Sequence, residues 1–308
     1  MRVFITGASG FIGSAVSGEL LAAGHAVTGL ARSDASAAAL AAAGVEVRRG
    51  TIDDLDVLRE ESLAADAVVH LAFKHDIAFS GRFDDAVDAD RAAVEAIGEA
   101  LAGSGKAFGI ASGVPVSDGG PTSEDQGHDT DAATTGPAAR FAVAEYALGL
   151  AARGVRSMVF RFPIVYGEGD PGFTATLVAT ARDKGVAGYL GDGANRWSGV
   201  HRADAAVLLR LAVERAPAGS TLHVVADEGV AIRDLAAVIG RGLGVPTASI
   251  APEDAAAHFG WLAGFVGADR AASSAFTREL LGWTPTRPGF LDDLDKGHYF
   301  ALGSPQGE

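Results

Sequence analysis

The hydrophobic pattern of roughly the first 160 residues alternates short β-rich runs with Ala- and Leu-rich stretches of helical periodicity. The short runs predict strands at about 2–6, 26–31, 45–48, 66–72, 106–112 and 155–161. The periodic stretches predict helices near 11–23, 35–43, 54–63, 83–103 and 137–153. Strands and helices in this order build a parallel sheet covered on both faces. The pattern therefore predicts an α/β fold with a doubly wound sheet.

The alternation ends after Arg161, where Gly and Pro residues cluster at 163–172. The later pattern predicts, in order, a helix near 173–184, a strand pair near 187–200, a helix over 203–215, a strand over 221–225 and then mostly helices. We therefore expect one domain from residues 1–162 and about 193–226, and a smaller, interleaved region from about 163–192 and 227–308.

The stretch 113–136, which follows the fifth predicted strand, is rich in Gly, Ser, Thr, Asp and Pro. It is longer than an ordinary connection, and loops of this length are usually functional or mobile. We expect a site beside it.

A glycine turn follows the first predicted strand, with the sequence Thr6-Gly7-Ala8-Ser9-Gly10-Phe11-Ile12-Gly13. Glycine permits a tight turn and a close approach of the backbone to a ligand. The N-terminus of the next helix offers unpaired N–H groups and a positive dipole. A strand, a glycine turn and a helix in this order predict a site for the pyrophosphate of a dinucleotide.

Several motifs resemble, in chain order, those of the extended and atypical short-chain dehydrogenase/reductases, the NAD-dependent epimerase/dehydratase group. The glycine turn resembles the TGxxGxxG fingerprint of this group. The other matching segments are Asp66-Ala67-Val68-Val69-His70-Leu71-Ala72, Ile110-Ala111-Ser112, Arg161-Phe162-Pro163-Ile164-Val165-Tyr166-Gly167, Gly191-Asp192-Gly193 and Val200-His201-Arg202-Ala203-Asp204-Ala205-Ala206. The resemblance spans roughly residues 1–240 and implies a Rossmann-type fold.

The resemblance also implies which residues would hold the dinucleotide. The pyrophosphate would lie against Gly7, Ser9, Gly10, Phe11, Ile12 and Gly13. The adenine would lie near Ile52 and Asp53, the ribose side near Leu71, Ala72 and Phe73, and the nicotinamide near Phe162, Pro163 and Ile164. Thr51 departs from the Asp that is usual at the family's adenine contact.

The end of the second predicted strand bears on the form of the cofactor. An NAD site places an acidic residue there, whereas an NADP site replaces it and adds a cation. This chain has Ala31 at that position, followed by Arg32 and Ser33. We therefore expect NADP(H) to be preferred over NAD(H), with Arg32 and Ser33 binding the 2′-phosphate.

The Tyr-x-x-x-Lys pair that the family usually provides is missing. None of the four tyrosines is followed four residues later by a lysine. In the predicted helix over 137–153, Pro137 and Phe141 stand at the two positions, and Arg140 lies one residue from the place of the lysine.

Three residues are candidates for the missing chemistry. Ser112 ends the fifth strand and is either a donor to the substrate oxygen or a strand-end cap; the alternative register places Gly113 there. His75, beside Asp76, is either a proton relay or part of a solvated loop. Tyr166 can donate a proton, but a phenol without a nearby cation keeps a pKa near 10, so packing is the alternative.

Composition limits the partners and the compartment. The 308 residues include 39 acidic and 25 basic side chains, a formal net charge of −14, so we expect neither nucleic acid nor an anionic membrane as a partner. Cysteine is absent, which excludes disulfides and thiolate chemistry and makes a cytoplasmic location the default. We expect no metal site, and we expect the acidic loop to be solvated; its residues are Glu124, Asp125, His128 and Asp129.

Aromatic residues in the C-terminal part form either a substrate pocket or plain core, namely Phe173, Trp197, Phe259, Trp261 and Phe265. Nucleotide-sugar enzymes of the family commonly offer several basic side chains to a diphosphate, whereas Arg196 is the only arginine between Gly191 and His201. This favours a hydrophobic carbonyl compound as the substrate.

The leading hypothesis is an NADP(H)-dependent oxidoreductase that reduces a ketone or aldehyde of a hydrophobic small molecule, or oxidises the alcohol. One alternative is an epimerase, dehydratase or steroid-type dehydrogenase of the same family. Another is a non-catalytic NADP-binding sensor resembling the NmrA-like regulators, which also lack the tyrosine and lysine. We also expect a homodimer, because the Ala-rich helices near 83–103 and 137–153 occupy positions that pair across subunits in extended family members.

Overall fold

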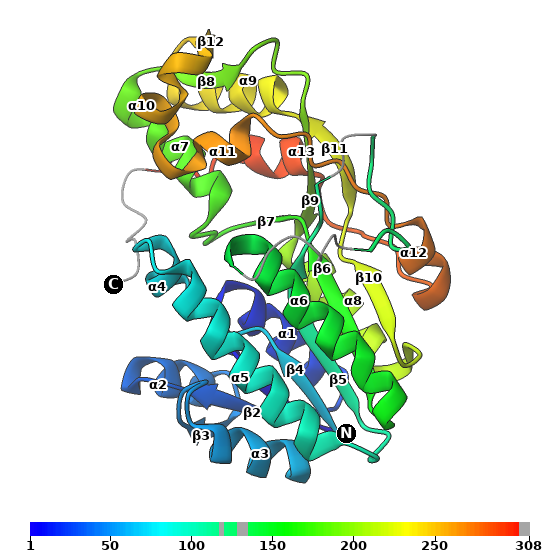
Figure 1. Ribbon diagram of the computed structural model, residues 1–308. Coiled ribbons are helices and arrows are strands. Elements are labelled where there is room, and N and C mark those ends of the chain that lie inside the picture. The colour runs from blue at the N-terminus through cyan, green and yellow to red at the C-terminus, as the bar shows by residue number, and fades with distance from the viewer. Residues whose placement is uncertain (117–119, 128–134, 302–308) are drawn as a thin grey trace.

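The central element of the computed structural model is a seven-stranded sheet (Figure 1). The structure describes residues 1–116, 120–127 and 135–301. Every neighbouring pair of strands in the sheet is parallel. The strands lie in the order β10 (Ser220–His223), β6 (Arg156–Phe162), β5 (Ala107–Gly113), β4 (Ala67–His70), β1 (Arg2–Thr6), β2 (Ala26–Ala31) and β3 (Glu46–Arg49).

Helices cover both faces of this sheet, because successive residues of each buried strand point to opposite faces. Val3 and Ile5 of β1 pack into one core and Phe4 into the other. The first core is closed by α1 (Phe11–Ala22), α2 (Asp34–Ala42) and α8 (Arg202–Arg215). The second is closed by α3 (Leu55–Ala64), α5 (Phe83–Leu101) and α6 (Gly136–Gly149). The predicted doubly wound α/β fold is confirmed, whereas the homodimer through α5 and α6 stays a prediction.

A second lobe contains two small sheets. One orders β11 (Asp227–Ala231), β9 (Arg196–His201) and β7 (Ile164–Tyr166), and the other pairs β12 (Thr247–Ile250) with β8 (Ala187–Leu190). The predicted strand pair near 187–200 is therefore wrong: both strands exist, but each pairs with strands distant in sequence. Local hydrophobic pattern identifies a strand but not its partner.

Short and long helices complete this lobe and its connections. They are α7 (Phe173–Lys184), α9 (Ile232–Leu243), α10 (Ala255–Phe259), α11 (Ala263–Val266) and α13 (Phe290–Asp295). Two further helices, α4 (His75–Phe79) and α12 (Ala275–Leu281), contact α5 and α8 respectively. In the described part of the chain, no helix combines the length and apolarity needed to span a bilayer.

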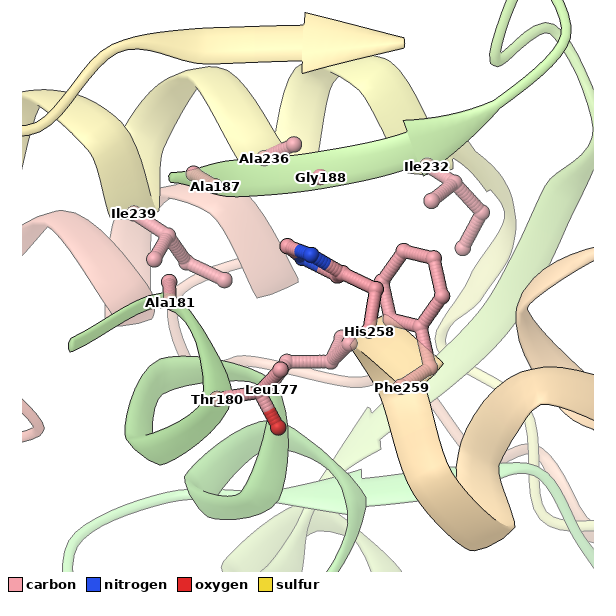
Figure 2. Close-up of a pocket in the computed structure, with 10 residues that line it drawn as sticks. All are labelled: Leu177, Thr180, Ala181, Ala187, Gly188, Ile232, Ala236, Ile239, His258 and Phe259. Atoms are coloured by element: carbon pink, nitrogen blue, oxygen red, sulfur yellow. The ribbon is translucent and has the colours of Figure 1, made fainter. Parts of the chain in front are cut away.

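The second lobe contains a small cavity. A cavity of about 10 Å³, lined by His258, Phe259 and Gly188 among others, has room for roughly one water molecule (Figure 2). Phe259 and Trp197 are both buried, so these two of the five aromatic residues belong to the core. The cavity is too small for a substrate.

The segment after β5 is held in place by hydrogen bonds to residues 271–277. The backbone of Thr122 exchanges hydrogen bonds with Ala271 and Ser273. Glu124 is only 7% exposed and accepts hydrogen bonds from the N–H and hydroxyl of Thr277 at 2.9 and 2.6 Å. The expectation that Glu124 is solvated is therefore wrong, because a distant helix buries it. His128 and Asp129 of the same acidic loop lie outside the described residues.

Candidate active site

The glycine turn between β1 and α1 has a geometry that only glycine satisfies. Gly7 has a φ of 73°, and a Cβ there would lie 2.8 Å from the backbone nitrogen of Ala72. A Cβ on Gly13 would lie 2.0 Å from the carbonyl oxygen of Gly7. The turn therefore packs directly against both the end of β4 and the first turn of α1.

The N-terminus of α1 is open to an anion. Its N-cap residue, Gly10, provides no side-chain hydrogen bond, and the first turn contains no acidic residue. Free N–H groups at the positive end of a 12-residue helix fit the pyrophosphate of a dinucleotide. The space beside the turn, which side chains at Gly7 and Gly13 would obstruct, therefore fits the pyrophosphate that the sequence predicts here.

The other predicted cofactor residues follow the carboxyl ends of β2, β3, β4 and β6. Because these strands are parallel to β1, their carboxyl ends lie at one edge of the sheet. Open parallel sheets bind ligands at this edge. The structure therefore brings the predicted pyrophosphate, adenine, ribose and nicotinamide residues to the same side of the sheet.

Two arginines meet at the end of β2. Arg32 is exposed and lies 3.5 Å from Asp76. Arg49, which pairs with Ala31 in the β2–β3 register, contacts the carbonyl oxygen of Ser33 and lies 2.7 Å from Asp34. Arg49 was not predicted from the sequence; its ion pair with Asp34 offsets the negative charge beside Arg32.

Ser33 begins α2 and is already used by the helix. Its hydroxyl accepts a hydrogen bond from the N–H of Ser36 at 3.1 Å, and the hydroxyl of Ser36 in turn accepts one from the N–H of Ser33 at 3.1 Å. This capping box fixes the loop that carries Arg32.

A charged pair joins the ends of β3 and β4. Lys74 donates to both oxygens of Asp53, at 2.8 and 2.6 Å. The sequence predicted Asp53 as an adenine contact and did not single out Lys74. The pair connects the adenine and ribose sides of the predicted site.

Behind the glycine turn lies a buried polar network that sequence reasoning missed. His70 places one ring nitrogen 2.8 Å from the Thr6 hydroxyl and the other 3.1 Å from Asp90 of α5. The Thr6 hydroxyl also accepts from the N–H of Ala72 at 3.3 Å. Buried polar groups with such partners fix a local structure, so the network holds β1, β4 and α5 in register beneath the turn.

Ser112 lies on β5, one residue before the strand ends. It is 4% exposed, and its Oγ is buried without a hydrogen-bond partner in the described part of the chain. A strand-end cap would bond to the backbone, which this hydroxyl does not do. A buried hydroxyl without a partner costs free energy.

His75 begins α4 and lies near one aromatic side chain, Phe73, and one basic side chain, Arg140. Its ring packs edge-to-face on Phe73, with 5.1 Å between the ring centres, and the guanidinium of Arg140 lies over the same Phe73 ring, 3.9 Å from its centre. Partial burial and the positive charge of Arg140 lower the pKa of His75. Asp76, the expected relay partner, faces Arg32.

Arg140 lies on α6, close to the position of the family lysine. Its Nε is buried without a hydrogen-bond partner among the described residues, and burial lowers the pKa of the guanidinium. Asp90 opposes this shift by its negative charge. Arg140 therefore brings a positive charge to Phe73, the residue predicted on the ribose side.

Tyr166 has a complete set of interactions. It is 1% exposed, donates to Asp227 at 2.7 Å and stacks on Phe290 at 4.5 Å. Burial and the Asp227 carboxylate raise the pKa of Tyr166 far above its usual range. His201 accepts a hydrogen bond from the N–H of Ala203 at the start of α8, and burial lowers its pKa.

Arg196 is paired with a carboxylate inside the second lobe. Its guanidinium donates to both oxygens of Asp269, at 3.2 and 2.7 Å. A bidentate pair of this kind is a strong one, so Arg196 is not a free cation. Among the described residues, no three His, Asp or Glu side chains converge as metal ligands.

The geometry defines a dinucleotide-binding enzyme of the Rossmann class, and comparison with known proteins gives its family. The model of the NAD dependent epimerase/dehydratase family matches residues 3–225. The chain therefore belongs to this family. It is an enzyme of the extended short-chain dehydrogenase/reductase kind, which acts with NAD(P).

Three relatives and one solved structure extend the comparison. The chain is 41% identical to Uncharacterized protein C2A9.02 of Schizosaccharomyces pombe over 97% of this chain and 100% of the relative. It is 31% identical to 3-diazoavenalumate denitrifying reductase of a Streptomyces species, over 96% and 100%. It is 27% identical to 4-hydroxy-2-methyl-3-oxo-4-farnesyl-3,4-dihydroquinoline-1-oxide ketoreductase of Stigmatella aurantiaca, over 76% and 70%. The UDP-glucose 4-epimerase of Thermotoga maritima has the same fold, with a TM-score of 0.77, 20% identity and coverage of 97% and 98%.

Proposed function

We propose that the protein is an NADP(H)-dependent reductase that acts on a ketone or aldehyde of a hydrophobic small molecule. The observation that carries the proposal is the buried hydroxyl of Ser112 at the carboxyl end of β5, which has no hydrogen-bond partner among the residues that the structure describes. A carbonyl oxygen there would give this hydroxyl the partner that it lacks. A donor aimed at the developing oxyanion stabilises the transition state.

The form of the cofactor is inferred from the end of β2. Ala31 stands where an NAD site has an acidic residue, so this position carries no negative charge. Arg32 follows it in the chain, and Arg49 is its partner in the β2–β3 register. The 2′-phosphate of NADP(H) would bind Arg32 in place of the exposed pair with Asp76, which contributes little. When bound, the cofactor supplies a hydride to the substrate carbon.

Carbonyl reduction also needs a proton on the oxygen. We propose His75 as its source and Arg140 as the positive charge in place of the family lysine, acting on the ribose side through its position over Phe73. The lowered pKa of His75 makes its protonated form a stronger acid but a rarer one at neutral pH. Reduction would therefore be fastest below neutral pH.

The ion pair between Arg196 and Asp269 favours a hydrophobic carbonyl compound over a nucleotide-sugar as the substrate. A nucleotide-sugar diphosphate would have to displace Asp269 from a bidentate contact. A hydrophobic carbonyl compound makes no such demand, and a ketoreductase is among the relatives.

A second candidate follows from the missing tyrosine and lysine together with the diazo-compound reductase among the relatives. Replacement of a diazonium group by hydride gives the C–H compound, N₂ and the oxidised cofactor, and it consumes no proton. A site that binds a hydride donor but lacks the usual acid is sufficient for this reaction. The hydride acceptor would then be an aryl diazonium carbon.

The test is turnover of stereospecifically deuterated NADPH with a panel of aromatic and aliphatic ketones and an aryl diazonium salt. The proposal expects deuterium at the former carbonyl carbon and oxidation of one NADPH per product. Deuterium in the arene with N₂ release, and none in any alcohol, would favour the second candidate. Tight cofactor binding without NADPH consumption or label transfer would overturn both.

A further inference from the structure

Arg270 and Arg196 are hydrogen-bonded through their backbones, but their guanidinium groups differ in whether they have a charged partner. The N–H of Arg270 donates to the carbonyl oxygen of Arg196 at 2.7 Å. Arg196 is neutralised by Asp269. The half-buried guanidinium of Arg270 meets neither a carboxylate nor a hydrogen-bond acceptor in the described ranges of the chain, and its Nε is buried. Among the described residues this positive charge is therefore uncompensated, although the whole protein has a net charge of −14.

Leaving a cation half-buried and unpaired is unfavourable. Burial lowers the pKa of Arg270, and no carboxylate in the described part of the chain offsets the shift. An anion that reached the guanidinium would restore the interactions lost on removal from water. The fixed planar fork of arginine suits a carboxylate in particular.

An aromatic cluster lies on one side of this charge, with Phe265 in contact with the guanidinium. The Arg270 guanidinium lies 4.8 Å from the ring centre of Phe265. Phe173 lies edge-on to Phe265 at 5.1 Å and to Trp261 at 5.3 Å. Trp261 is 45% exposed, so this cluster reaches the surface.

The cluster lies close to the predicted nicotinamide position. Phe173 is the first residue of α7, which contacts β7, and β7 begins at Ile164. In Figure 1, β7 runs between the two lobes, with α7 and α11 above it. A ligand covering these aromatic rings would extend toward the reacting end of the cofactor.

We propose that Arg270 binds the carboxylate of a small aromatic or apolar carboxylic acid, whose body packs on Phe173, Trp261 and Phe265. The inference rests on the proposed function only in treating this acid as the substrate. A phosphate ester is the weaker fit, because phosphate sites usually combine several donors or a helix N-terminus. One guanidinium matches a single carboxylate charge.

The experiment measures binding without turnover, in protein saturated with NADP⁺. Calorimetry compares 3-phenylpropionate with the neutral 3-phenylpropionamide, which has the same shape. The proposal expects the acid to bind about 10- to 100-fold more tightly than the amide. It expects Arg270→Met, which retains length and apolar contact with Phe265, to abolish this preference, and Arg270→Lys to retain part of it.

The matched control is Arg241→Met, which removes an exposed arginine of the same lobe that is paired with Asp295. It should leave the preference for the acid unchanged. Equal binding of acid and amide by the natural protein, or an unchanged preference in a folded Arg270→Met variant, would overturn the inference. The deuterium-transfer experiment tests the proposed reduction independently, since the preference for the acid over the amide does not require hydride transfer.

Discussion

At the glycine turn, backbone atoms lie so close together that no side chain fits, whereas at the reacting edge several side-chain groups are buried without partners. A Cβ on Gly13 would lie 2.0 Å from the Gly7 carbonyl oxygen. In contrast, Ser112 Oγ and Arg140 Nε have no hydrogen-bond partner among the described residues. The backbone of the first region is tightly packed before any ligand binds, whereas polar groups of the second still lack hydrogen-bond partners among the described residues.

This contrast separates two kinds of sensitivity to mutation. Added volume at the turn acts on the backbone and so affects both folding and cofactor binding. Removal of an unpartnered polar group costs the folded state nothing and acts on the bound state alone. Stability and turnover should therefore change together in the first region and independently in the second.

The largest expected effect is that of Gly13→Ala. The new methyl group forces the turn away from α1, so NADPH affinity should fall by about 100-fold or more, measured by fluorescence titration. Gly18→Ala in the same helix is the control, because a Cβ there meets nothing within 4 Å. It should stabilise the protein by about 0.5–1 kcal/mol. Normal NADPH affinity in Gly13→Ala would disprove the description of the turn.

Ser112→Ala should lower kcat by about 100-fold while the melting temperature stays unchanged or rises. The matched control is Ser157→Ala on the adjacent strand, whose hydroxyl donates to the Leu148 carbonyl oxygen at 3.3 Å. That change should cost about 1 kcal/mol of stability and leave kcat unaffected. If Ser112→Ala lost stability and kept its kcat, the hydroxyl would be a structural group after all.

Arg32→Ala should weaken NADPH binding by about 10- to 150-fold and leave NADH binding nearly unchanged. The reason is loss of a charge-assisted contact to the 2′-phosphate. Arg59→Ala removes an exposed arginine paired with Asp56 and serves as the control in titrations with both cofactors. An equal loss for NADPH and NADH would refute the assignment to NADP(H).

His75 should give reduction a pH dependence of about ten-fold per pH unit above its pKa. Because the pKa of His75 lies below 6.5, kcat should rise as pH falls from 8 toward 6. The same shift destabilises the folded protein as pH falls through 6.5, since the unfolded chain binds the proton more readily. In a kcat profile, His75→Gln should remove the slope; a retained slope would assign the proton to another group.

The smallest effect on turnover is expected for Tyr166→Phe. The change removes the hydroxyl that donates to the partly buried carboxylate of Asp227, which keeps its backbone hydrogen bond from Phe290, and should cost about 1–3 kcal/mol of stability. Because the hydroxyl is enclosed by Asp227 and Phe290, kcat should not change. Denaturant unfolding and steady-state kinetics on one preparation check both statements, and a large drop in kcat would restore Tyr166 as a proton donor.

Sequence alone was sufficient for the parallel sheet and for the glycine turn. The six strands predicted in the first 162 residues are all present, because buried parallel strands form continuous apolar runs. The helix α4 was not predicted, since five residues are too few to show a helical period. The seventh strand, β10, was predicted as a strand, but its place at the edge of the sheet beside β6 follows only from the topology.

The amino-acid sequence by itself determined the fold, the dinucleotide turn and the absence of the tyrosine–lysine pair, because each depends on residues close together in the chain. Tertiary structure decided which charges are free. Arg196 and Arg270 look alike in sequence, yet Asp269 neutralises only the first. The sequence predicts a solvated loop around Glu124, yet Thr277, far along the chain, binds this carboxylate in a buried position. The state of a charged group depends on the neighbours that folding brings to it, and the local pattern of residues does not record them.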